Sequence, residues 1–426
     1  MKYSRYNSII ENNKGEQFIV NCLHDSIIQI DPKLGEIVRV NNANNLKTIH
    51  PDLFFHLKKK KMIVPKSFDE INLSIEKRQQ NLTKNKILRI TINPTLDCNL
   101  KCWYCYEKRI SKSIMTQETL KNVVDFIRKK IENNAFEVIL LSFFGGEPLM
   151  GYNKVIIPLL EAIKIICEKE NIQLYHHYTT NATLLTPKRI DKLLSYSKKM
   201  GIQVAFDGGK DMHNKTKFYT NGKGCYSSML FNVKAAIRKG VNTNVRCNVT
   251  LENARTFKDL INDLKDVSEN KNLRISFQKV WQERKSTQLT TRIKGLQPLL
   301  NKVSIKSNIH NTEVRQEPCY ADYENSFVIN FNGDLYKCTA RDFTIKNRIG
   351  FLTEGGHVFY TEEFINRIRR QYKPVCACCR ILPICPICSQ SKYETLENIC
   401  PNQNDESAER NVIKSYYHKE LHANEI

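Results

Sequence analysis

Short apolar runs alternate with amphipathic stretches between about residues 87 and 280. In the stretches 119–128 and 188–194, apolar side chains recur at helical spacing, which indicates helices with one buried face. A strand followed by a helix, repeated six times, predicts a parallel sheet or a partial (β/α)6 barrel of the TIM type. The runs that indicate strands are 87–94, 138–143, 173–178, 203–206, 244–249 and 273–277.

The chain on either side of this pattern has a different character. Residues 17–22 and 26–31 indicate two short strands, and a polar, charged stretch near 74–85 indicates a linker helix. After about residue 300 the alternation stops and cysteines dominate. We therefore expect an α/β chain with three parts: a small N-terminal α+β domain (1–86), the partial barrel (87–300) and a cysteine-rich extension (301–426).

Cys98, Cys102 and Cys105 follow the first predicted barrel strand with the spacing C-x3-C-x2-C. Barrels of this type place their chemistry at the C-terminal ends of their strands, which is where this cysteine triad falls. Three closely spaced thiolates are soft ligands that suit a cubane iron–sulfur cluster. Because three ligands leave one of the four irons open to a small molecule, the spacing indicates chemistry as well as structure.

The setting decides how the fifteen cysteines are interpreted. No apolar stretch follows the first charged residues, so we expect no signal peptide, and no window approaches the length of a membrane span. In an intracellular chain, clustered cysteines indicate metal binding in preference to disulfides.

The formal net charge of +22 has several interpretations. The only tight basic run is 58–61, and the bias toward lysine extends along the whole chain. Charge alone does not distinguish a nucleic-acid surface from an acidic peptide partner or a generally basic composition. A non-catalytic cluster or zinc protein that binds nucleic acid is therefore an alternative, and it predicts salt-sensitive binding.

Gly145, Gly146, Glu147 and Pro148 directly follow the second predicted barrel strand. Adjacent glycines let a backbone approach a ligand closely, and a proline fixes the exit of the turn. Backbone carbonyls and the nearby carboxylate can accept hydrogen bonds from an ammonium group. This motif, following a cysteine loop on the neighbouring strand, argues against a non-catalytic protein.

Together, the cysteine triad and the Gly-Gly-Glu-Pro motif resemble the radical S-adenosylmethionine (SAM) superfamily over residues 87–280. The resemblance implies that the triad holds a 4Fe–4S cluster whose open iron chelates the methionine amino and carboxylate groups of SAM. It implies that one-electron reduction cleaves SAM to a 5′-deoxyadenosyl radical, which takes a hydrogen atom from the substrate. Gly145, Gly146 and Glu147 match positions that contact the methionine amino group.

The resemblance assigns further SAM contacts to later strand ends, at Thr180, Asn181, Asp207, Lys217, Arg246 and Asn248. The first two stand in Thr-Asn-Ala where the family usually reads Thr-Asn-Gly, and the aspartate stands in a matching Phe-Asp-Gly. Lys217 falls where many members carry an arginine for the SAM carboxylate, and lysine lacks the bidentate fork of arginine. Arg246 and Asn248 alternate on one strand face, and ordinary barrel filling is an equal interpretation for these later positions.

The C-terminal cysteines resemble the SPASM extension of radical SAM enzymes, which typically holds two auxiliary clusters. Its seven positions are filled by Cys319, Cys338, Cys376, Cys379, Cys385, Cys388 and Cys400. The interval from Cys385 to Cys388 is two residues, where three are usual. The resemblance assigns Cys319, Cys338 and Cys388 to the first auxiliary cluster and the other four to the second. Cys378 is surplus, either a fourth ligand of the first cluster or a spare thiol.

Zinc ribbons are the alternative for this region, because paired C-x2-C motifs alone favour zinc. After a radical SAM core, the same cysteines favour iron–sulfur clusters. The remaining cysteines have no partners in the sequence pattern and are interpreted as ordinary residues: Cys22, Cys167, Cys225 and Cys247.

SPASM enzymes mostly modify peptides and proteins, and two branches compete here. One comprises maturases of ribosomally made peptides (RiPPs), which install thioether or carbon–carbon crosslinks; the other comprises anaerobic sulfatase maturases, which make formylglycine. Residues 1–86 resemble the N-terminal recognition region of the first branch. Sulfatase maturases carry an aspartate base after the cysteine of the G-x4-C element, whereas this chain has Thr339 after Cys338. Threonine is no general base near neutral pH. Asp342 is either a displaced base or a surface carboxylate, and we expect the surface carboxylate.

The expected partners follow from the first branch. A leader-bearing precursor peptide would add as a strand to an exposed sheet edge of the N-terminal domain. The cluster chemistry implies an electron donor such as a flavodoxin or ferredoxin and an oxygen-poor cytoplasm. We expect neither a membrane nor a nucleic acid among the partners.

Overall fold

The computed structural model describes residues 1–284, 286–307, 318–369, 372–401 and 405–421. The chain forms two compact units, each with its own core. The larger unit contains Lys86–Asn311 and Asn325–Ile365, and the smaller contains Met1–Asn85, Thr312–Glu324 and Asn366–Ile426. The predicted three-part division follows expected roles and stays a prediction; the packing groups the N-terminal and C-terminal segments into one unit.

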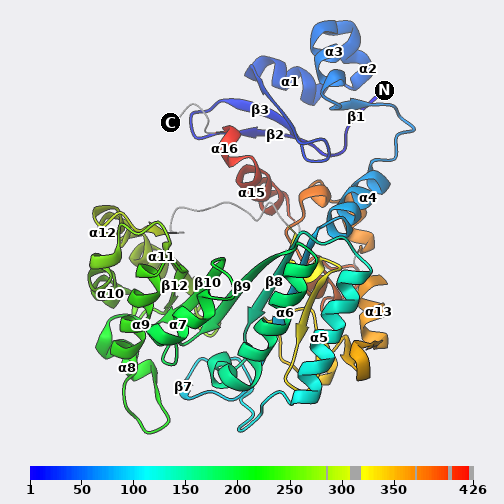
Figure 1. Ribbon diagram of the computed structural model, residues 1–426. Coiled ribbons are helices and arrows are strands. Elements are labelled where there is room, and N and C mark those ends of the chain that lie inside the picture. Colours follow the sequence, from blue (N-terminus) through cyan, green and yellow to red (C-terminus); the bar gives the residue numbers. More distant parts are fainter. Residues whose placement is uncertain (285, 308–317, 370–371, 402–404, 422–426) are drawn as a thin grey trace. The chain divides into compact units, whose positions relative to one another are not determined.

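An eleven-stranded sheet forms the frame of the larger unit (Figure 1). Six neighbouring strands at its centre pair in parallel and follow one another in chain order, which confirms the predicted succession of βα units. They are β6 (Ile87–Ile92), β8 (Val138–Phe143), β9 (Gln173–Thr180), β10 (Met200–Phe206), β12 (Asn242–Val249) and β13 (Leu273–Lys279).

Helices cover one face of this sheet because alternate strand residues on that face are buried and apolar (Figure 1). The other face carries more polar side chains, and these supply much of the site described below. The helices are α5 (Gln117–Glu132), α6 (Ile157–Lys169), α7 (Pro187–Leu194), α8 (Lys210–Thr216), α9 (Tyr226–Arg238), α10 (Phe257–Asp263), α11 (Thr287–Lys294) and α12 (Gln297–Lys302). The two helices predicted at 119–128 and 188–194 are α5 and α7.

Part of the cysteine-rich segment continues the barrel sheet. Strand β15 (Ser326–Ile329) pairs in parallel with β6, and the antiparallel strands β16 (Asp334–Tyr336), β17 (Gly350–Leu352) and β18 (Val358–Tyr360) follow it. On the opposite edge, β14 (Lys306–Ser307) pairs with β13. The end of the βα alternation in the sequence is therefore not the end of the sheet.

The smaller unit contains an antiparallel sheet of β2 (Asn7–Glu11), β3 (Gln17–Asn21) and β4 (Ser26–Ile30). Strands β3 and β4 are the two that the sequence predicts. A further pair joins β1 (Lys2–Tyr3) to β5 (Ile63–Val64). The helices of this unit are α1 (Pro32–Val40), α2 (Ala43–Ile49), α3 (Pro51–Lys59), α4 (Glu70–Thr83), α14 (Ser389–Tyr393), α15 (Glu406–Tyr416) and α16 (His418–Leu421), and α13 (Glu362–Arg369) begins just before it. The predicted linker helix is α4, which begins earlier than expected because Asp69 caps it by accepting a hydrogen bond from the Asn72 backbone.

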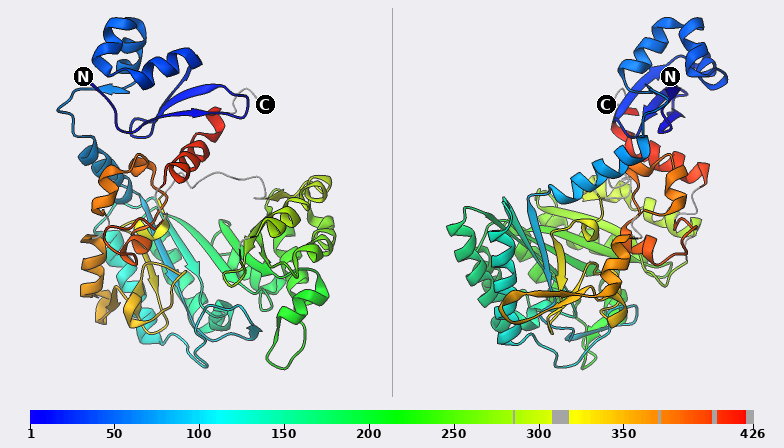
Figure 2. Two further views of the ribbon diagram at one scale, coloured as in Figure 1. Left: turned by 180° about the vertical axis from the view of Figure 1, so that it is seen from behind. Right: turned by 90° about the vertical axis from the view of Figure 1, so that its right-hand side faces the viewer.

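Both faces of this small sheet are covered, by α1–α3 on one side and by α15 and α16 on the other (Figures 1 and 2). Successive side chains of β3 point to opposite faces of the sheet, which explains why both faces are covered. Ile19 belongs to a core with Leu46 and Phe54, whereas its neighbour Val20 belongs to a core with Ile413 from α15. N-terminal and C-terminal segments thus share a core, which no local sequence pattern indicates.

Among the described residues, no helix is both long and apolar enough to cross a membrane.

Candidate active site

The cysteine triad lies on a loop that begins after β6 and is held at its base by Asp97. The Asp97 carboxylate accepts hydrogen bonds from the backbone N–H groups of Cys98 and Lys112, both at 2.8 Å, and from the Arg109 guanidinium at 2.9 Å. Although burial opposes it, these donors hold the pKa of Asp97 below its usual value. The carboxylate therefore stays ionised and fixes the start of the loop. Asp97 is not among the residues predicted from the sequence.

Tyr104, between the second and third cysteines, anchors the loop to the barrel. Its hydroxyl donates to Asp207 Oδ1 at 2.7 Å and accepts from Asn248 Nδ2 at 3.0 Å. Asn248 in turn accepts from Arg246 Nε at 2.9 Å. Three of the predicted site residues thus belong to one hydrogen-bond network, and the tyrosine at its centre was not predicted. The position of this aromatic residue between two cluster cysteines is the sequence feature that could have indicated its role.

Lys217 joins this network from the short strand β11 (Lys217–Tyr219), which pairs with β7 (Leu100–Cys102) so that Lys217 faces Cys102. Its ammonium donates to the Ala205 carbonyl at 2.7 Å and lies 3.4 Å from Asp207 Oδ2. Burial alone would lower the pKa of Lys217, but the Asp207 carboxylate holds it well above its ordinary value. The site therefore carries a buried, permanently charged cation beside the second cysteine.

The glycine motif packs directly against the cysteine loop. A side chain at Gly145 would place Cβ 2.3 Å from the Thr95 carbonyl oxygen, and Gly145 has φ +106°. At Gly146 the Cβ would lie 2.2 Å from the Asp97 carbonyl oxygen. Only glycine permits this approach.

Glu147 is fully buried, and its carboxylate accepts hydrogen bonds from Thr180 Oγ1 and from the backbone N–H groups of Asn181 and Leu149, at 2.7, 2.7 and 2.9 Å. Asn181 then donates to Asn99 on the cysteine loop at 2.9 Å. The carboxylate therefore positions the end of β9. A contact between Glu147 and the SAM amino group stays a prediction.

These residues surround one cavity of about 200 Å³ in the larger unit. Most of the predicted site residues line it: Cys98, Cys102, Cys105, Gly145, Gly146, Thr180, Asn181, Lys217, Arg246 and Asn248. Three predicted residues, Glu147, Pro148 and Asp207, are buried and are not among those that line it. The cavity is also lined by Tyr106, Glu107 and the exposed Trp281, which were not predicted from the sequence.

Comparison with known families identifies this arrangement. Residues 92–264 match the profile of the radical SAM superfamily. This part of the chain is a radical SAM domain. The resemblance inferred from the cysteine triad and the glycine motif is confirmed.

Several proteins are similar in sequence to part of this chain. An uncharacterised protein of Methanocaldococcus jannaschii is 26% identical over 262 residues, which are 60% of this chain and 84% of that protein. The radical SAM cyclopropyl synthase TigE of Paramaledivibacter caminithermalis is 24% identical over 300 residues, 63% of this chain and 61% of TigE. A cysteine-type anaerobic sulfatase-maturating enzyme of Clostridium perfringens is 28% identical over 176 residues, 39% of this chain and 46% of the enzyme. The similarity thus spans less than two thirds of the latter two.

The fold has a counterpart among solved structures. The structure of anSMEcpe with bound AdoMet matches with a TM-score of 0.58 and 19% sequence identity, over 80% of this chain and 96% of that one. At this identity the match concerns the fold, and it agrees with the α/β architecture predicted for the radical SAM domain.

The radical SAM cysteines fit the cluster that the family implies. All three are free thiols, two half-buried and one exposed, on the wall of one cavity. Burial raises the pKa of Cys98 to about 11 and that of Cys102 to about 12, so both are protonated at neutral pH until iron displaces the proton. Within the described ranges, no three His, Cys, Asp or Glu side chains form a site for a single metal ion. A cubane cluster, by contrast, takes each thiolate on a different iron.

The C-terminal cysteines are divided between the two units. Cys338 belongs to the larger unit, and the other six predicted auxiliary ligands belong to the smaller one. Among these six, Cys319 and Cys388 lie within hydrogen-bonding reach, and the hydrogen bond from Cys319 lowers the pKa of Cys388. Cys378 is exposed, whereas Cys379 is buried. The assignment of two auxiliary clusters stays a prediction.

Proposed function

We propose that the chain is a radical SAM peptide maturase that installs a thioether or carbon–carbon crosslink in a ribosomally made peptide. The observation that carries the proposal is the single cavity in which three free thiols face two glycines and the polar ends of β9, β10 and β12. Cys98, Cys102 and Cys105 would hold a 4Fe–4S cluster, which would supply the electron for reductive cleavage of SAM and so the radical for hydrogen abstraction from the peptide.

The residues of the cavity have distinct roles in this proposal. The cysteine triad holds the cluster, and Gly145 and Gly146 leave room beside it for the methionine part of SAM. Thr180 and Asn181 offer polar side chains at the next strand end. Lys217 supplies positive charge near the SAM carboxylate, although its hydrogen bond to Ala205 and its ion pair with Asp207 also give it a positioning role.

A peptide substrate is supported by one solved structure and by the C-terminal cysteines. That structure, of anSMEcpe, is described with a bound peptide. We assign Cys319, Cys338 and Cys388 to one auxiliary 4Fe–4S cluster. The second takes Cys376, Cys379, Cys385 and Cys400. A flavodoxin or ferredoxin in an oxygen-poor cytoplasm would supply the electron.

The second candidate is a sulfatase-maturating activity, which the similarity to the C. perfringens enzyme favours. Its aspartate base is replaced here by Thr339, whose backbone carbonyl accepts a hydrogen bond from Tyr106 at 3.3 Å. Asp342 is exposed, as expected for a surface carboxylate. A peptide carrying Cys or Ser in a sulfatase-type sequence would be converted to formylglycine under this alternative and left unchanged under the first.

The first test is the iron and sulfide content after anaerobic reconstitution. We expect roughly twelve irons in the native chain and about eight when Cys98, Cys102 and Cys105 are all replaced by Ala, given four irons per cubane. Cys167→Ala, in α6, is the matched control and should leave the count unchanged. A content of about four irons, together with bound zinc, would contradict the assignment of auxiliary iron–sulfur clusters. If reduced, cluster-replete enzyme formed no 5′-deoxyadenosine with its peptide, the proposed maturase activity would be wrong.

A further inference from the structure

One carboxyl group on the wall of the radical SAM cavity takes no part in the hydrogen-bond network of that site. Glu107 lies two residues after the third cysteine of the triad, and it is the one acidic side chain among the described residues that line the cavity. Its Oε1 atom is buried and has no hydrogen-bond partner within the described part of the chain. A buried carboxyl oxygen without a partner costs free energy unless a ligand supplies a hydrogen bond or a positive charge. The group therefore indicates a ligand.

The cations that line the same cavity are engaged with other groups. Lys217 forms an ion pair with Asp207 at 3.4 Å, and the Arg246 guanidinium donates to Asn248 at 2.9 Å. Within the described residues, neither cation is among the charges that act on Glu107. A positive charge for this carboxyl group therefore has to come from a molecule that enters the cavity.

A second acid, Asp342, does act on the Glu107 carboxyl. The segment that carries it contacts the cysteine loop, because the Tyr106 hydroxyl donates to the Thr339 carbonyl at 3.3 Å. Asp342 and Tyr106 are both exposed, so this part of the wall is open to a ligand from solvent. Two neighbouring acids disfavour each other's charge, and a cation brought beside them would favour the carboxylate form of both.

Aromatic side chains belong to the same wall. Tyr106 and Trp281 line the cavity, and the Trp281 side chain is 73% exposed. The segment with this tryptophan is tied to the cysteine loop, because Gln282 Nε2 donates to the Tyr104 carbonyl at 3.1 Å. Aromatic faces attract cations, and they can cover the methylene groups of a long charged side chain. An unpaired carboxyl group together with exposed aromatic rings suits the cationic side chain of a peptide.

We propose that Glu107, assisted by Asp342, binds a lysine or arginine side chain of the substrate peptide and so selects which peptides enter the site. That the ligand is the substrate rests on the proposed function. The formal net charge of +22 repels cations from the molecule as a whole, so a preference for a cationic peptide has to come from a local site. The methionine ammonium group of SAM is the other cation that could meet Glu107, and the test separates the two.

The test is a selection from a library of short random peptides on the full chain, reconstituted anaerobically with SAM and without a reductant, so that no turnover occurs. Selected peptides should be enriched in Lys or Arg. A fluorescent version of the best one should bind about tenfold more weakly when its cationic residue becomes Gln, and Glu107→Gln should remove that difference. Asp342→Asn, at an exposed position, should lower the difference by about threefold.

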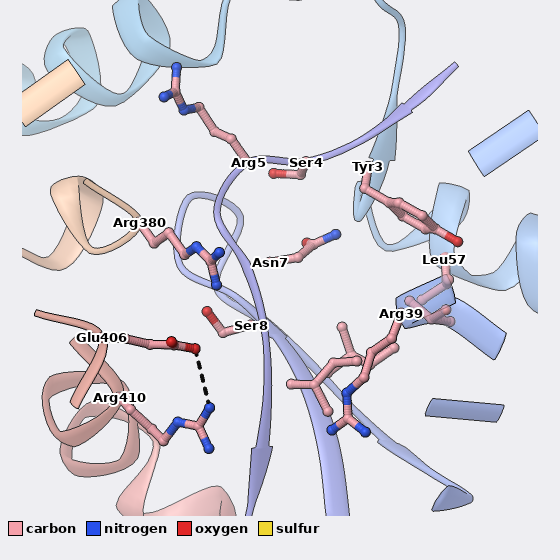
Figure 3. A pocket seen from close by; sticks show the side chains of 13 residues that line it. Tyr3, Ser4, Arg5, Asn7, Ser8, Arg39, Leu57, Arg380, Glu406 and Arg410 are labelled. Carbon is pink, nitrogen blue, oxygen red and sulfur yellow. Dashed lines mark hydrogen bonds and ion pairs between the residues drawn. The ribbon is translucent and has the colours of Figure 1, made fainter. Parts of the chain in front are cut away.

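Glu406→Gln is the matched control. Glu406 lines a separate cavity of about 400 Å³ in the smaller unit, where it forms an ion pair with Arg410 at 3.4 Å (Figure 3). This variant should keep the full preference for the cationic peptide. Glu107→Gln should bind SAM normally in equilibrium dialysis and retain the native iron content, which separates a role in peptide binding from a SAM contact or a damaged cluster loop.

Peptides selected without enrichment in Lys or Arg, or a preference that survives Glu107→Gln, would overturn the proposal. Loss of SAM affinity in this variant would also overturn it, because Glu107 would then hold SAM. If Glu107→Gln loads no cluster, Asp342→Asn carries the test, and an unchanged preference there decides against the proposal. Because the assay needs no turnover, a chain that forms no 5′-deoxyadenosine but still prefers the cationic peptide would refute the maturase and leave the role of Glu107 intact.

Discussion

At the scale of single residues, the site depends on Tyr104 more than on its predicted polar contacts. One hydroxyl satisfies both Asp207 and Asn248 and ties the cysteine loop to β10 and β12. Tyr104→Phe leaves two buried polar groups without that partner and should destabilise the larger unit by about 1–3 kcal/mol. It should lower 5′-deoxyadenosine formation while retaining most of the iron, measured by thermal unfolding, product analysis and iron content. Tyr175→Phe is the control, because the exposed Tyr175 hydroxyl donates a long hydrogen bond to Gln173 Oε1 at 3.4 Å.

The close packing of Gly146 against the cysteine loop leads to a second prediction at this scale. The Cβ of Gly146→Ala would press on the Asp97 carbonyl, which is backbone and cannot move without shifting the cysteine loop. We expect loss of SAM binding by equilibrium dialysis, together with a stability cost of about 1–3 kcal/mol from overpacking. Gly295→Ala, where the nearest atoms lie 3.5 Å away, should change neither. Normal SAM affinity in the Gly146 variant would contradict the close packing described here.

At the scale of elements, α5 links the barrel to the start of the cysteine-rich segment. Phe126 on α5 makes an edge contact with Phe327 of β15, with 5.2 Å between ring centres, and its backbone lies against Gly356. Phe126→Ala should cost about 3–5 kcal/mol of unfolding free energy, because it opens a cavity between helix and sheet. Phe231→Ala on α9, whose side chain is 63% exposed, should cost far less. Denaturant unfolding compares the two, and equal costs would show that this contact is not a packing centre.

At the scale of the whole molecule, the prediction concerns the core that the chain's two ends share. Val20 packs with Ile413 of α15, whereas Ile19 packs with α2 and α3. Both substitutions to Ala remove buried methyl groups and should destabilise the smaller unit. Only Val20→Ala should speed proteolytic cleavage within α15, read by mass spectrometry. Equal cleavage in the two variants would contradict the two-sided sheet.

What the sequence predicts at this scale follows from how local the signals are. Local sequence patterns predict the six barrel strands, β3, β4 and α4. Strand and helix periodicity can be recognised from residues that are close together in the sequence. Ten of the residues that line the cavity were predicted, because the cysteine triad and the glycine motif together resemble one family, which assigns the later strand-end positions. The pairing of β15 with β6, the shared core of β3 and α15, and the role of Tyr104 depend on contacts between residues far apart in the chain, which no local pattern encodes.

The shared core has a consequence for biosynthesis. Domains generally fold as units during translation, the N-terminal one first. Here the sheet β2–β4 leaves the ribosome before the radical SAM domain, whereas the residues that cover one of its faces, such as Ile413 of α15 and Leu421 of α16, are made after that domain. The nascent sheet would therefore expose apolar side chains such as Val20 while the domain behind it folds, and a chaperone would be needed most during that interval.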